Sequence, residues 1–152
     1  MRKFWIAGGV LATAFAAAGS VMAQSELLQS TVLMRQQGTL VYRNLNSMVK
    51  GDAPYDQAKV DEILRDLGAS AAKISAAFPA SDKGKESQGS RYVASPKVWE
   101  ARADFDAKAA NMVKVMQDVQ GKPKSLDQLK VAATAINGAC DACHDTYRIR
   151  KN

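Results

Sequence analysis

Residues 126–150 read LDQLKVAATAINGACDACHDTYRIR, and this stretch decides the fold. Its apolar side chains recur every three or four residues, at Leu129, Ala133, Ile136, Cys140, Cys143 and Tyr147. That spacing predicts an α-helix with a single apolar face, which has to be buried against other helices. Ser125 precedes the stretch and Gln128 follows three residues later, which is the spacing of a capping box at a helix start.

Three earlier stretches show the same helical periodicity. They cover residues 25–49, 56–78 and 96–120. Asp56 is placed to cap the second stretch, and Ser95-Pro96 marks the start of the third. No stretch alternates apolar and polar residues with period two, so we expect no sheet. The sequence therefore predicts an all-α fold: a four-helix bundle with up-down-up-down topology and a long loop at residues 80–94.

The N-terminus has the pattern of a secretory signal peptide. Arg2 and Lys3 precede an uncharged, largely apolar stretch, and Ala23 ends a run of small residues suited to cleavage. A membrane anchor is the alternative, but the apolar run is shorter than the roughly 20 residues that a span needs. We therefore expect residues 1–23 to be removed on export to the bacterial periplasm, which leaves residues 24–152 as one domain with no stable membrane span.

The charge of the chain excludes one large class of partner. Lys and Arg number 21 against 15 Asp and Glu, so the net charge is only +6. No run of basic residues exceeds three, and aromatic side chains do not alternate with the basic ones. We therefore expect no binding of nucleic acid.

Cys140-Asp141-Ala142-Cys143-His144 is a C-x-x-C-H motif, which is typical of covalent haem attachment. Cys140 and Cys143 lie on one helical face, where both thiols can add to the two vinyl groups of one haem. His144 follows closely enough to ligate the iron through an imidazole nitrogen. The motif predicts one haem c, covalently attached and held inside the bundle near one end.

Other interpretations of the two cysteines fit less well. A redox-active pair is expected at a helix start near a βαβ unit. A structural zinc site needs about four ligands, whereas the chain has two cysteines and one histidine. A disulfide between residues three apart in a helix has poor geometry. Because the motif uses His144, no histidine remains for a catalytic triad or dyad, and we expect a protein that is not an enzyme.

The sixth iron position must be filled by a methionine, by a weaker ligand or by nothing, since His144 is the only histidine. At 1.5 Å per residue, His144 lies about 9 Å and Met34 about 13 Å from the same end of the bundle. The other candidates are expected about 24–34 Å from that end; they are Met48, Met112 and Met116. Met34 is thus expected to be the only methionine level with the haem.

Two small residues support this position for Met34. Thr31 and Gly38 lie one turn before and one turn after it on the same face and leave room for a flat macrocycle. Methionine also fills gaps in ordinary cores. The spacing alone leaves both roles open for Met34.

The chain resembles the class II c-type cytochromes, the group that includes cytochrome c′ and its low-spin relatives. The resemblance covers essentially all of residues 24–152. It rests on Lys50-Gly51 with Ala53-Pro54-Tyr55-Asp56, on Ser95-Pro96-Lys97-Val98-Trp99, and on Cys140 to Arg148. Placement of C-x-x-C-H near the C-terminus is distinctive, because class I cytochromes carry it near the N-terminus. The family fold is a four-helix bundle.

The resemblance implies one of two functions. Low-spin members ligate the iron with a methionine on the first helix, and Leu33-Met34-Arg35 with Gly38 resembles that pattern, which gives Met34 and His144 the axial roles. We therefore expect a one-electron carrier that serves periplasmic redox proteins. The alternative is a five-coordinate, high-spin protein like cytochrome c′ that binds nitric oxide or carbon monoxide. A third hypothesis is a binding module that carries no haem. The possibility of a homodimer is left open.

Three basic residues follow the motif closely: Arg148, Arg150 and Lys151. They could lie near the haem propionates or guide an acidic partner. They could instead complement the dipole at the C-terminal end of the helix. Arg148, about one turn after His144, is our candidate for the haem side, and the dipole role is expected for the other two.

The attachment chemistry is directly testable. If Cys140 and Cys143 form thioethers, haem stays with the polypeptide during acid–acetone extraction and in a denaturing gel stained for haem. Cys140→Ala should leave at most one linkage, whereas His144→Ala should disturb the iron ligation without removing the haem. Complete loss of haem from the unmodified protein under these conditions would refute the assignment.

Overall fold

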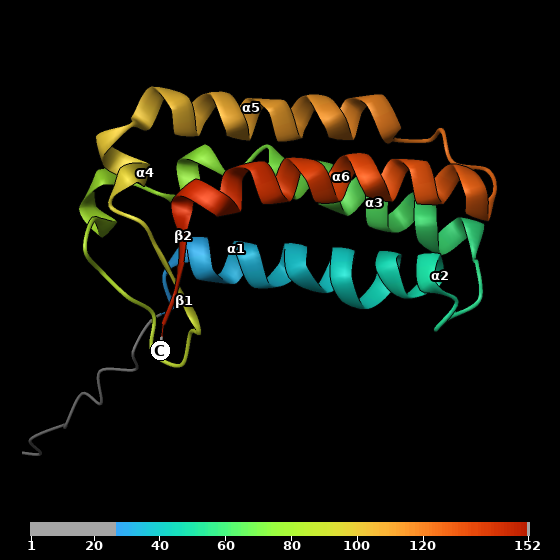
Figure 1. Cartoon of the computed structure of the whole chain (residues 1–152), viewed down its shortest axis with the longest axis horizontal. Helices are drawn as coiled ribbons and strands as arrows, with labels where there is room; N and C mark the ends of the chain where they lie inside the picture. The colour runs from blue at the N-terminus through green and yellow to red at the C-terminus, as the bar shows by residue number, and fades with distance from the viewer. Residues whose placement is uncertain (1–26, 152) are drawn as a thin grey trace, which may run out of the picture.

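The computed structural model describes residues 27–151, and the expected signal peptide lies outside the described residues. Four long helical segments pack side by side and run alternately in opposite directions (Figure 1). This is the predicted four-helix bundle with up-down-up-down topology. The segments are α1 (Gln29–Gly38) continued by the π-helical η1 (Thr39–Leu45) and α2 (Asn46–Lys50), α3 (Gln57–Ala71), α4 (Lys97–Glu100) followed by α5 (Arg102–Val119), and α6 (Leu126–Tyr147).

Side chains that were expected to start two of these helices do so. Asp56 accepts a hydrogen bond from the Lys59 amide at 3.1 Å at the start of α3. The hydroxyl of Ser125 accepts from the Gln128 amide at 3.3 Å, and the Gln128 side chain accepts from the Lys124 amide at 2.7 Å. One backbone donor in the first turn of α6 and one just before its N-cap are satisfied in this way, which fixes where the helix begins.

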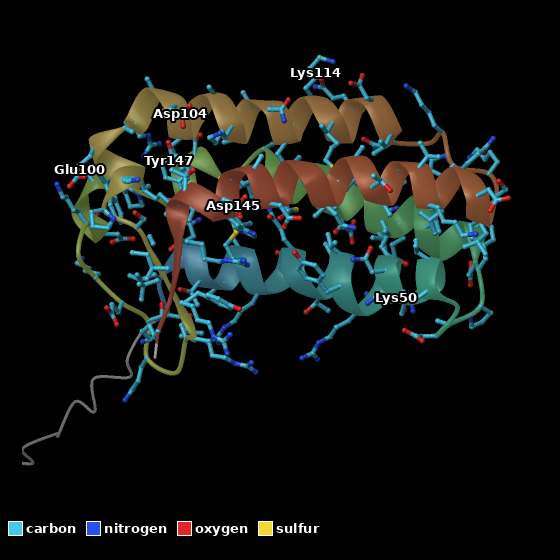
Figure 2. The ribbon with its side chains drawn as sticks, viewed as in Figure 1. Lys50, Glu100, Asp104, Lys114, Asp145 and Tyr147 are labelled. Carbon is cyan, nitrogen blue, oxygen red and sulfur yellow. The ribbon has the colours of Figure 1, made fainter. Side chains whose placement is uncertain are left out.

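All four helical segments contribute to a continuous apolar core. At one end of the bundle, the ring of Phe105 contacts Phe78 and Tyr147 edge to face, with centroids 5.1 and 5.2 Å apart. The hydroxyl of Tyr147 donates to the Asp104 carboxylate at 2.5 Å, and both residues are labelled in Figure 2. Edge-to-face rings with a satisfied hydroxyl fix α5 against the last turn of α6.

The expectation that the chain has no sheet is wrong for two three-residue strands. β1 (Tyr92–Ala94) pairs antiparallel with β2 (Arg148–Arg150), with Val93 opposite Ile149. Strands of three residues are too short for a period-two pattern to be visible in a sequence. The pairing also ends α6 at Tyr147, whereas we expected the helix to continue to residue 150.

The long loop before the third helix is more ordered than expected. The second helix, which was expected to reach residue 78, ends at Ala71 and is followed by the 3-10 turn η2 (Ser75–Ala77). The loop at residues 80–94 then begins with another 3-10 turn, η3 (Ala80–Asp82), and leads into β1. Figure 1 shows it crossing the end of the bundle where α1 begins and α6 ends. Within residues 27–151, no helix combines the length and the apolarity required to span a membrane.

The core predicts a clear difference in stability between truncating a buried leucine and truncating an exposed valine. Leu64 on α3 is fully buried, so Leu64→Ala should lower the free energy of unfolding by about 2–5 kcal/mol. Val131 on α6 is 73% exposed, and Val131→Ala should change the free energy of unfolding by less than about 0.5 kcal/mol. Denaturant unfolding of the two variants measures these free energies. Equal losses of stability would show that Leu64 is not buried in the core as the structure has it.

Candidate functional site

A cavity of about 590 Å³ lies at the end of the bundle where α1 begins and α6 ends. Its volume is within the range of small-molecule and cofactor sites. The structure brings all four sequence-predicted site residues to this one cavity: Met34, Cys140, Cys143 and His144. Side chains from η1, α5 and the loop before β1 complete its wall.

The last turns of α6 place the C-x-x-C-H motif at the cavity wall. Cys140 and Cys143 are partly buried and are not bonded to each other. Burial, with the neighbouring Asp141 carboxylate, raises the pKa of the Cys140 thiol to about 11, and burial also raises the pKa of Cys143. Reactive redox cysteines have lowered pKa values. The pair therefore lacks the electrostatics of a dithiol catalyst and fits covalent attachment.

His144 has the properties of an iron ligand. Burial, helped by the Arg148 guanidinium, holds the pKa of His144 below its ordinary value, so the imidazole is neutral at pH 7. A metal-binding imidazole has to be neutral. Its Nδ1 atom is buried and has no hydrogen-bond partner among residues 27–151. A partly buried imidazole with an unpartnered Nδ1, beside two thiols and a cavity, fits the haem that the motif implies.

The opposite wall is formed by the first helix. Met34 is partly buried there, between Thr31 and Gly38, which also border the cavity. A Cβ atom added at Gly38 would approach only the Tyr42 ring, at 4.0 Å. No protein neighbour therefore requires a glycine at this position, and the open space beside it suits a flat ring. Ligation of iron by Met34 remains a prediction.

Met34 is not the only methionine that reaches the cavity. Met112 on α5 is buried and borders the same cavity, whereas Met48 and Met116 do not. The third helical segment is broken between α4 and α5, and the cavity reaches farther along the bundle than our estimate from helix rise allowed. Met112 therefore has to be compared with Met34 in any test of the sixth ligand.

Sequence reasoning missed the part of the wall that comes from the loop. Lys85, Ser87 and Tyr92 all border the cavity. A polar loop carries no periodicity that reports contact with a distant site. The one signal available was the aromatic Tyr92 in an otherwise polar stretch.

The three basic residues after the motif have different roles. Arg148 borders the cavity, with its guanidinium carbon 4.6 Å from the centroid of the Tyr92 ring. Arg150 is exposed in β2, and the Lys151 ammonium forms an ion pair with Glu86 at 3.2 Å. The dipole role expected for Arg150 and Lys151 is wrong, because both lie beyond the last turn of α6.

Within residues 27–151, no group of three or more histidine, cysteine or acidic side chains is arranged to hold a metal ion.

Comparison with known proteins gives concordant matches over nearly the whole chain. The sequence model of the cytochrome c′ family matches residues 32–148. Cytochrome c-555 of Bradyrhizobium diazoefficiens is 42% identical over 93% of this chain and 95% of its own length. Cytochrome c′ of Rhodopseudomonas palustris is 32% identical over 88% of this chain and 89% of its own length. An NMR-validated structural model of oxidised cytochrome c556 from R. palustris superposes with a TM-score of 0.71 at 36% identity, covering 82% of this chain and 95% of that one.

The position of Arg148 predicts an electrostatic effect on the site. Arg148→Gln removes a positive charge at the cavity. Because this loss disfavours the reduced state, it should lower the reduction potential by on the order of tens of millivolts. Arg150→Gln makes the same change in net charge at an exposed site away from the cavity and should shift the potential less. Redox titrations at low and high salt measure the shift for each variant. Equal shifts for the two variants would show that Arg148 is no closer to the haem than Arg150.

Proposed function

Because the chain belongs to the cytochrome c′ family, we propose that it is a periplasmic one-electron carrier whose haem iron is held by His144 and Met34. Family membership establishes the coarser identity: the chain is a monohaem c-type cytochrome with one covalently attached haem c, and it is not an enzyme. The axial ligand of the first helix, the export and the redox partners are parts of the proposal.

The observation that carries the proposal is the placement of Met34 and His144 on the same cavity from two different helices. Cys140 and Cys143 would hold the haem through thioether bonds, and His144 would supply the fifth ligand. The bound haem supplies a one-electron couple between ferric and ferrous iron. Met34 would supply the sixth ligand and leave no open position for a substrate or a gas.

This ligand set has consequences for the energetics of electron transfer. Methionine with histidine raises the reduction potential of haem iron, and burial in an apolar bundle acts in the same direction. The walls of the cavity come from helices fixed by a continuous core, so the protein residues need to rearrange little when the iron changes charge.

Export to the periplasm is supported by the N-terminal sequence. Arg2 and Lys3, the apolar stretch and the small residues up to Ala23 have the order of a signal peptide. In this proposal, residues 1–23 are removed and residues 24–152 form the haem domain. Its partners would be redox proteins of the same compartment.

The role of Met34 can be tested through the spin state of the iron. Met34→Ala removes the sulfur and should convert the iron from low-spin to high-spin, increase its affinity for carbon monoxide and lower its potential. Met112→Ala tests the other methionine at the cavity and should leave the spectrum low-spin. Met116→Ala, in the core away from the cavity, should cost about 2–5 kcal/mol of stability and also leave it low-spin.

Two results would contradict the proposal in different ways. A high-spin spectrum for Met112→Ala with an unchanged spectrum for Met34→Ala would transfer the axial role to Met112. A high-spin spectrum for the unmodified protein would replace the carrier by the five-coordinate, gas-binding function.

A further inference from the structure

The helix that carries Met34 begins without a cap of its own. α1 starts at Gln29 after Leu28, whose side chain has no oxygen to accept a hydrogen bond, and the first turn contains no acidic residue. The first amides of a helix have no partner within the helix, and a missing N-cap typically costs about 1 kcal/mol. Met34 lies less than two turns from this start, so fraying there would reach the cavity.

A residue from the loop before β1 holds the start of this helix through side-chain hydrogen bonds. The Ser87 hydroxyl accepts a hydrogen bond from the Leu28 amide at 2.9 Å and donates one to the Thr31 hydroxyl at 2.7 Å. Ser87 is only 3% exposed, although its neighbours in the loop are exposed. One buried side chain therefore holds both ends of the first turn of α1, from 59 positions away along the chain.

The loop that carries Ser87 is itself attached to the end of α6. β1 pairs with β2, which directly follows α6, and the Ser95 amide donates to the Tyr147 carbonyl at 2.9 Å. The Lys151 amide donates to the Arg91 carbonyl at 2.9 Å, and its ammonium pairs with Glu86. The serine is thus held by the same segment that follows His144, and it connects the helices of the two axial residues.

A second contact fixes α1 beyond Met34. The Gln37 side chain donates to the Ser70 hydroxyl of α3 at 2.8 Å, and both residues are buried. Thr31 and Gln37 therefore lie on either side of Met34, and each is held by a serine from another segment. The contact with Ser87 is at the helix end, where fraying begins.

We propose that Ser87 is a positioning residue for the sixth ligand: by bonding to Leu28 and Thr31 it holds the first turn of α1, keeps Met34 at the iron and suppresses opening of the site to small gases. This inference rests on the proposed ligation by Met34. Loss of Ser87 should let the first turn of α1 fray and release Met34 for part of the time. Because a gas binds only the open form, its apparent affinity rises in proportion to the fraction of molecules that are open.

The test compares three serine variants of the haem-loaded protein. Ser87→Ala removes both hydrogen bonds, Ser70→Ala removes the buried contact beyond Met34, and Ser81→Ala changes an exposed serine near the start of the same loop. Carbon monoxide titration of the reduced protein should show about a fivefold higher affinity for Ser87→Ala, the factor expected for loss of a typical net hydrogen-bond contribution. Ser70→Ala and Ser81→Ala should stay near the unmodified protein.

Hydrogen exchange supplies a readout that does not depend on the iron. Amides of residues 28–32 should exchange faster in Ser87→Ala, while those of α3 and α5 keep their protection. Thr31→Val keeps the shape of the side chain but removes one of the two hydrogen bonds, and its effect should be intermediate.

The outcomes separate this inference from the proposed function. If the unmodified protein is low-spin, Met34→Ala is high-spin and Ser87→Ala binds carbon monoxide no better than Ser81→Ala, the role of Ser87 is refuted and the ligand assignment stands. Equal gains for Ser87→Ala and Ser70→Ala would show general loosening and would also refute it. If the unmodified protein is already high-spin, both proposals fail together.

Discussion

The rest of the structure depends on one constraint: the last turns of α6 have to present two thiols and an imidazole to a single flat group inside the bundle. Protein interiors are close-packed, yet this bundle leaves a cavity of about 590 Å³ at that end. A cavity of this size leaves the apolar side chains around it without the packing contacts of an ordinary protein core. The covalently attached haem is therefore part of the core as well as the redox centre.

Much of this arrangement could be predicted from the sequence because it depends on local rules. Helical periodicity predicted the four segments, and Asp56 and Ser125 cap helices as their neighbours in the sequence indicated. The C-x-x-C-H motif carries its chemistry within five residues, and the comparisons support the haem it implies. In each case the interacting groups lie within one or two helical turns of each other.

What could not be predicted depends on contacts between distant segments. The pairing of β1 with β2 joins segments more than fifty residues apart, and a strand of three residues shows no pattern of its own. Met112 reaches the cavity through the placement of α5 relative to α6, which helix rise alone does not determine. Ser87 is one of several serines in a polar loop, and only the folded chain distinguishes it as a buried contact at the start of α1.

The turn between α5 and α6 lies at the pole of the bundle opposite the cavity (Figure 1). Gly121 in this turn has a positive φ of 72°, and its neighbour Lys122 is exposed. The described chain instead begins and ends at the pole where α1 begins and α6 ends (Figure 1). A surface tether or an electrode linkage placed at residues 121–122 would leave the cavity end facing solution, whereas one placed near either end of the described chain would lie at the same pole as the cavity.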